Sequence, residues 1–203
     1  VLRVGGQSLF SSFNNLDVYD VMSNNYSEYF GFTLEETKEM LEYYNLELTK
    51  EVKDHYDGYI FGKTHVCNTW SILNYCNRKE LDPYWISTGS NKLIKKLLNE
   101  TSNKEPIEKL LQGDSIDFKY DKSITYESFT EVDNLNNLFN LLLVTGYITF
   151  DRKEESTFSE KNYFKIPNKE VKEDFIRIVD NISYKQRIVT IENYEDFIQS
   201  FLS

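Results

Sequence analysis

The chain has few cysteines, no long apolar run and little basic charge, and each shortage excludes a class of protein. Its two cysteines, Cys67 and Cys76, cannot form a disulfide framework, so we exclude a small secreted scaffold and expect a reducing cytoplasm. No apolar stretch is long enough to form a signal peptide or a membrane-spanning helix. The formal net charge of −10 repels phosphate backbones, so we do not expect the surface as a whole to bind nucleic acid.

The motifs of several common enzyme classes are also missing. There is no GxxxxGK[ST] loop to hold nucleotide phosphates, and the pair Gly5-Gly6 lacks the lysine and hydroxyl that would follow it. There is no GxSxG, HExxH or CxxC motif. The spacing of His65, Cys67 and Cys76 is wider than that of a structural zinc site. We therefore predict no catalytic residue, no metal and no cofactor within this chain.

Aromatic residues, in contrast, are abundant. The 203 residues include 15 Tyr and 14 Phe, and 40% of the chain is hydrophobic, which indicates a folded protein with a core. Aromatic residues, turn residues and amides are densest at 55–91, in the strings HYDGYIFG, CNTWSILNY and YWISTGSN. There the turn signals Asp57-Gly58 and Gly62 bracket a short aromatic strand.

The first half of the chain is predicted to be mainly α-helical. Thr33 and Glu36 match a capping box, from which a helix runs to about Tyr44. Thr49 begins a second helix that ends near Tyr56. Further helices are expected near 69–77, 90–99 and 105–111. These helices leave little room for a sheet in this half.

The second half predicts a helix, a hairpin and another helix. The expected elements are extended segments at 115–120 and 123–126, a helix from Asp133 or Asn134 that ends at Gly146, strands at 147–150 and 163–166 around a charged loop, a helix from Pro167-Asn168, and a final helix from about Asn193. Helix, hairpin and helix in this order are the skeleton of a winged-helix-like unit.

Six blocks of the sequence, in the same order, resemble the AAA-ATPase-like family of P-loop proteins. The blocks are SLFSSFNNLDVYD at 8–20, EYFGFTLEET at 28–37, HYDGYIFG, CNTWSILNY, YWISTGSNKLI, and LLLVTGYITF with KIPNKEV. They are similar to the family's blocks FGFTEEEV, WYNGYRFG, YNPWSILNYL and YWVNTSSNDLI, among others. The resemblance covers about residues 1 to 175.

The resemblance implies a P-loop ATPase core upstream of Val1, followed by a helical lid, a winged-helix-like piece and often a PD-(D/E)XK nuclease-like domain. It divides this chain into the end of the core at 1–20, a helical lid domain at 21–113, and a winged-helix-like domain with a C-terminal helix at 114–203. The expected fold is mainly α within the α+β class. ATP and Mg are expected only with the upstream core, so the parent protein rather than this chain would be the ATPase.

The resemblance also implies which residues of a lid would approach nucleotide. The candidates are Asn14, Asn15, Asp57, Tyr59, Asn68, Ser90 and Asn91. A purely structural role is the alternative for some of them, with the two N-terminal asparagines as caps and Asp57 in a hairpin turn. Ile60 stands where the family usually has Arg or Lys, and Ser12 stands where it has Gly. Both changes favour a degenerate or structural copy of the lid.

Three functions remain open at this point. The first is a non-catalytic lid that closes on, or senses, nucleotide bound upstream. The second is a protein-interaction module that uses the aromatic segment 55–91. The third is DNA binding through the winged-helix-like unit, which ranks last because helix 134–144 carries no Lys or Arg. The expected partners are therefore the upstream core and a protein, and neither nucleic acid nor a membrane.

Overall fold

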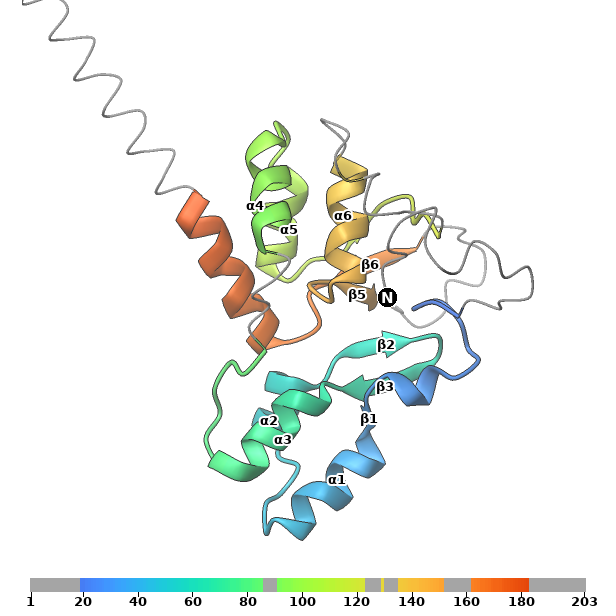
Figure 1. The fold of residues 1–203 in the computed structure, drawn as a ribbon, viewed down its shortest axis with the longest axis vertical. Coiled ribbons are helices and arrows are strands. Elements are labelled where there is room, and N and C mark those ends of the chain that lie inside the picture. Colours follow the sequence, from blue (N-terminus) through green and yellow to red (C-terminus); the bar gives the residue numbers. More distant parts are fainter. Residues whose placement is uncertain (1–18, 86–90, 123–128, 130–134, 152–161, 183–203) are drawn as a thin grey trace, which may run out of the picture.

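The structure is a computed structural model that describes residues 19–85, 91–122, 129, 135–151 and 162–182. Within these residues the fold is α+β, with two small antiparallel sheets (Figure 1). The predicted strand at the N-terminus, the extended segment at 123–126, the cap at Asp133 or Asn134 and the final helix from Asn193 lie outside the described residues.

The N-terminal lobe, defined here as residues 19–85, combines short helices with a sheet. Its elements are the 3₁₀ helix Ser27–Phe30, β1 (Phe32–Thr33), α1 (Leu34–Tyr43), α2 (Lys50–Tyr56), β2 (Tyr59–Phe61), β3 (Thr64–Cys67) and α3 (Thr69–Arg78). The predicted capping box is confirmed, because the Thr33 hydroxyl accepts from the Glu36 N–H and the Glu36 carboxylate accepts from the Thr33 N–H. Local side-chain chemistry therefore sets where α1 begins.

The three-stranded sheet of this lobe corrects the expectation that the first half has little room for a sheet. Its strand order is β1-β3-β2, and both pairings are antiparallel. The hairpin turns at Gly62, which has a φ of +54° and whose added Cβ would lie 2.4 Å from the Ser23 carbonyl oxygen. The strands are too short to show an alternating pattern, and β1 exists only because Phe32 pairs with Cys67.

The C-terminal lobe, defined here as residues 91–182, contains the predicted hairpin. Its elements are α4 (Asn91–Glu100), α5 (Glu105–Gln112), β4 (Ile116–Asp117), α6 (Leu135–Val144), β5 (Thr149–Asp151), β6 (Tyr163–Lys165) and a helix at 169–182. β4 pairs with β6, so the sheet order is β4-β6-β5. Gly146 follows α6 with a φ of +86°, which confirms the predicted left-handed helix end.

Buried side chains form two hydrophobic clusters, one within the N-terminal lobe and a larger one that includes residues of both lobes. The smaller cluster joins α1, α2 and α3 through Leu41, Val52 and Ile72. The larger one combines side chains of α4, α5, α6, β6 and helix 169–182 with Tyr59 and Val66 from the first sheet. This cluster contains residues on both sides of residue 113, where the resemblance places a boundary between two domains. That domain boundary stays a prediction. None of the helices in the described part of the chain is both long and apolar enough to cross a membrane.

Candidate functional site

A pocket of about 280 Å³ lies where the first sheet meets the end of α6. Its lining includes Tyr59, Asn68, Trp85, Gly146, Thr149 and the entry segment 19–21. The lining residues come from both lobes, so the packing of one lobe on the other creates the pocket. In Figure 1, β2 and β3 lie directly beneath β5 and α6 at this place.

Two hydrogen bonds between the lobes shape the pocket wall. The Tyr59 hydroxyl donates to the Gly146 carbonyl oxygen at 2.9 Å. The Ile60 N–H donates to the Thr149 hydroxyl, also at 2.9 Å and in a buried position. Thr149 therefore accepts a hydrogen bond from a backbone N–H on the side of β2 that does not face β3, and this bond connects β2 to β5.

Burial keeps two titratable side chains of the pocket lining, Tyr59 and Cys67, in their neutral forms. Burial raises the pKa of Tyr59 far above neutral pH, so its hydroxyl stays protonated. Burial likewise raises the pKa of the Cys67 thiol to about 11, which leaves it a poor nucleophile. Among the described residues, no group of three or more His, Cys, Asp or Glu side chains could hold a metal ion. The arrangement is suited to contact with a partner or ligand.

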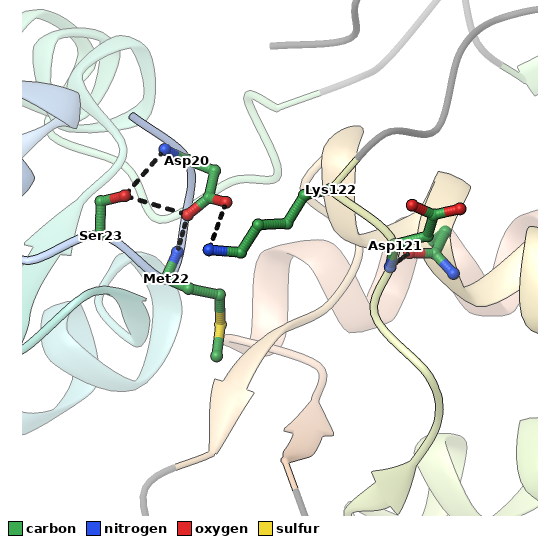
Figure 2. Close-up of polar contacts among 6 residues, drawn as sticks. Asp20, Met22, Ser23, Asp121 and Lys122 are labelled. Atoms are coloured by element: carbon green, nitrogen blue, oxygen red, sulfur yellow. Dashed lines mark hydrogen bonds and ion pairs between the residues drawn. The ribbon is translucent and has the colours of Figure 1, made fainter. Parts of the chain in front are cut away.

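Asp20, one of the residues that line this pocket, fixes the entry segment through the contacts drawn in Figure 2. Its carboxylate accepts from the Met22 N–H at 3.0 Å and from the Ser23 hydroxyl at 3.1 Å. Lys122, which follows β4, places its ammonium 3.4 Å from the other carboxylate oxygen. Burial alone would raise the pKa of Asp20, but the Met22 N–H and Lys122 outweigh it and lower the pKa. Asp20 therefore remains ionised and ties the entry segment to the C-terminal lobe.

The structure brings together only some of the predicted site residues. Tyr59 and Asn68 line the same pocket, and the Asn68 side chain also caps α3 by accepting from the N–H groups of Trp70 and Ser71. Asn91 is the first residue of α4, and its side chain is not described. The remaining candidates Asn14, Asn15 and Ser90 lie outside the described residues.

Asp57 does not lie in a hairpin turn, which was the structural role considered for it. It is the C-cap of α2, and its carboxylate accepts from the Gly58 N–H at 2.6 Å. It lines a different hollow, beside Pro167 and Lys169. The Asp-Gly pair is typical of turns of several kinds, and here the tight turn joins a helix to a strand.

Ile60 occupies a position at which the family that the sequence resembles usually has Arg or Lys. Its side chain is buried within β2, and its N–H is the group that Thr149 accepts. A Lys or Arg at this place would need its charge buried or redirected to solvent. In this chain the position contributes to the core and not to phosphate contact.

The most unusual polar residue, Glu170, was not among the predicted site residues. Its carboxylate is 0% exposed, and the Ser71 hydroxyl lies 2.9 Å from both of its oxygens. The Trp85 N–H donates to it at 2.6 Å. Burial raises the pKa of Glu170 to about 7, although hydrogen bonds from the Trp85 N–H, Ser71 and the Tyr84 N–H oppose the rise. A glutamate in the first turn of a helix resembles an ordinary solvated residue, so only its place in the KIPNKEV block singles it out.

Several aromatic side chains of the N-terminal lobe are exposed, and two of them, Tyr19 and Phe30, line the pocket. Tyr29 is 76% exposed and Trp70 is 62% exposed, whereas most aromatic residues of the described chain are at least partly buried. Tyr19 and Tyr26 meet edge to face with ring centroids 4.9 Å apart. Phe30, which lines the pocket, stacks on Phe61 at 4.8 Å. The aromatic surface is defined here by the exposed residues Tyr19, Tyr26, Tyr29, Phe30 and Trp70, of which Tyr19 and Phe30 also line the pocket.

The chain is similar to part of a curated protein. A curated protein of Azotobacter chroococcum mcd 1, described as an uncharacterized protein in the vnfD 5' region, is 28% identical over 168 residues. The match covers 81% of this chain but only 30% of that protein. No protein-family model matches the chain, and no solved structure matches it. The chain is therefore similar to a part of a longer protein whose printed name assigns no activity.

Proposed function

We propose that this chain is the non-catalytic lid and winged-helix-like region of an AAA-ATPase-like protein, and that it closes on or senses nucleotide bound by an upstream core. One observation carries the proposal. Tyr59 and Asn68, both expected to approach nucleotide, line one pocket together with the entry segment 19–21. By the resemblance, that segment spans the boundary between the end of the ATPase core at 1–20 and the lid, so the pocket would lie close to where the lid meets its core.

The contacts of the entry segment suit a lid that moves as a unit. Asp20 pairs with Lys122 of the C-terminal lobe, and the Val21 carbonyl accepts from the Gly62 N–H at 2.9 Å in the N-terminal lobe. A displacement that begins at the core would therefore act on both lobes at once. The larger hydrophobic cluster contains side chains of both lobes, so the lobes transmit such a displacement better than two unpacked lobes would.

The C-terminal lobe supports a winged-helix-like assignment in its strand order and in the placement of α6 before the hairpin. Its α6, however, is unsuited to reading DNA. Residues 138–143 of this helix are all buried. The amides of Asn136 and Asn140 bond the backbone at 119–121 and do not face outward as a recognition helix requires. The lobe acts as a scaffold, and we do not propose DNA binding.

The same proposal implies the cofactors, the first partner and the location of the chain. ATP and Mg would arrive with the upstream core, which would be the chain's first partner. A cytoplasmic location is also part of the proposal. Both cysteines are free and buried, which suits a reducing compartment.

Hydrogen exchange on the longer protein, which contains the upstream core, tests the lid proposal. Added ATP analogue should protect amides within 55–85 and at the start of α4, because lid closure buries the pocket mouth. Amides of α1, which contributes no residue to the pocket lining, serve as the internal control and should not change. Equal exchange of 55–85 with and without nucleotide would rule the lid role out.

A second function, binding of a protein partner, is favoured by the aromatic surface, two of whose members line the pocket. Tyr29 and Trp70 are among its most exposed rings, and such rings often anchor interfaces. Replacement of either by Ser should weaken capture of a partner in a pull-down without nucleotide. Tyr43→Ser is the matched control, because Tyr43 is 81% exposed and lies on α1. An equal effect of all three changes would contradict a specific surface.

A further inference from the structure

Glu170 joins three segments that are far apart in the sequence. It lies in the first turn of helix 169–182, it accepts from the Ser71 hydroxyl of α3, and it accepts from the Trp85 N–H at the end of segment 81–85. In Figure 1 the start of this helix lies against the end of that segment, at the boundary between the lobes. One side chain thus provides polar contacts to two segments at this boundary.

Among the described residues, the carboxylate has hydrogen-bond donors but no cation. None of the ion pairs among the described residues includes Glu170, and its neighbour Lys169 instead lies 3.9 Å from Asp54. An ionised carboxylate that is fully buried without a cation is costly, whereas a protonated one is not. The contact is therefore more stable when Glu170 carries a proton.

We propose that Glu170 is a proton-operated latch, which holds α3 and the segment 81–85 against helix 169–182 and releases them as the pH rises. The latch acts on the contact between the lobes, whether or not the chain serves as a lid. Opening would let water reach the carboxylate, so it would replace a buried charge with a hydrated one. The same opening would loosen Trp85, which lines the pocket and packs edge to face on Tyr147 at 4.9 Å.

The charged and titratable groups around Glu170 favour this direction. The groups that interact with it are Tyr56 of α2, Tyr59 of β2, Tyr84 of segment 81–85 and Glu173 of its own helix. The three tyrosines stay neutral near pH 7, because their pKa values are raised. Glu173 carries a like charge and disfavours the ionised form of Glu170.

The sign of the pH effect follows from the pKa of Glu170 in the two states. In the latched state it is about 7, and in the released state it returns toward the ordinary value of about 4.3 for a solvated glutamate. The ratio of latched to released protein should fall by up to about tenfold per pH unit between these two values. Above pH 7 the ratio should level off, because both states are then ionised.

Hydrogen exchange of segment 81–85 and α3 between pH 5 and 8 measures this ratio, as protection factors corrected for the intrinsic exchange rate. In the wild-type chain, protection should fall with rising pH and level off near 7. Glu170→Gln should remove the fall, since glutamine does not titrate. Asp180→Asn is the matched control: it makes the same chemical change at an exposed position of the same helix and should keep the wild-type profile.

Two further variants keep the test decisive. Ser71→Ala removes a hydrogen bond that lowers the pKa of Glu170, so the fall should end at a higher pH even if Glu170→Gln folds poorly. In a Trp70→Phe background Trp85 is the remaining tryptophan, and its emission should shift to the red as the latch opens. A wild-type profile without any fall would overturn the latch. So would a fall of the same size in Glu170→Gln.

Discussion

The Glu170 carboxylate accepts hydrogen bonds from residues that lie 85 and 99 positions before it in the chain. Gly58 is equally dependent on a distant partner, because an added Cβ would lie 1.9 Å from the Pro167 carbonyl oxygen. Neither constraint is visible locally. A glutamate near a helix start and an Asp-Gly pair are both common at solvent-exposed positions, and only burial by another segment gives them their particular roles.

Glu170 should make the whole fold less stable as the pH rises. Its folded pKa of about 7 exceeds the unfolded value of about 4.3, so the folded state holds a proton that the unfolded state has released between these pH values. The free energy of unfolding should therefore fall by up to about 1.4 kcal/mol per pH unit in that range. Urea denaturation at a series of pH values measures this slope, and Glu170→Gln should reduce it. An unchanged slope in that variant would contradict the assignment.

Substitution of Gly58 tests the close approach to Pro167. Gly58 and Gly113 have φ values of +118° and +97°, so alanine is strained by roughly 1–2 kcal/mol at either position. Only Gly58→Ala adds a clash, since an added Cβ on Gly113 meets no described atom within 4 Å. We expect Gly58→Ala to lower the free energy of unfolding by roughly 3 kcal/mol or more, and Gly113→Ala by its strain alone. Equal losses in urea denaturation would show that the clash is relieved by movement.

At the scale of elements, the helices and the late hairpin follow from local patterns, whereas the pairing of the shortest strands does not. Thr33 and Asn68 begin their helices with side-chain caps, which need only neighbouring residues. β1 and β4 are two residues long and acquire their identity from partners 35 and about 48 residues away, Cys67 and Phe164. Helix α6 also fixes a segment that has no regular structure of its own. Its Asn140 side chain forms hydrogen bonds with the backbone of Lys119 and Asp121, which follow β4.

Two asparagines of α6 offer a matched pair of substitutions. Asn140 is 0% exposed, accepts from the Asp121 N–H at 2.9 Å and donates to the Lys119 carbonyl at 3.0 Å. Asn140→Ala leaves buried groups unpaired and should lower the free energy of unfolding by about 1–3 kcal/mol. Asn136 also bonds Lys119 but in an exposed setting, so Asn136→Ala should cost less. Chemical denaturation that ranked the two variants the other way would contradict the role of burial.

At the scale of the whole molecule, a few polar contacts align two lobes that share one apolar core. Tyr59 with Gly146, Ile60 with Thr149 and Asp20 with Lys122 each join residues of both lobes. The pocket exists only while these contacts hold, because each lobe contributes part of its lining. Any function of the pocket, as a lid contact or as a partner surface, therefore depends on the packing between the lobes.

Thr149→Val should loosen the lobes without changing the side-chain volume much. It removes the only hydroxyl that the buried Ile60 N–H is seen to bond within the described residues. We expect a loss of about 1–3 kcal/mol in the free energy of unfolding and faster hydrogen exchange in both β2 and β5. Thr145→Val is the control, because the Thr145 hydroxyl bonds the Leu141 carbonyl within its own helix. Faster exchange confined to β5 would show that Thr149 does not couple the sheets.

The sequence by itself determined the helices, their caps, the late hairpin and the dense aromatic segment at 55–91, because these depend on residues within a few positions of one another. It also named Tyr59 and Asn68, which do share a pocket. The tertiary structure alone decided the first sheet, the place of Asp57 at a helix end and the burial of Glu170. The physical reason is that strand pairing and burial are set by contacts between segments that are distant in the chain, and no local pattern encodes which segment a residue will meet.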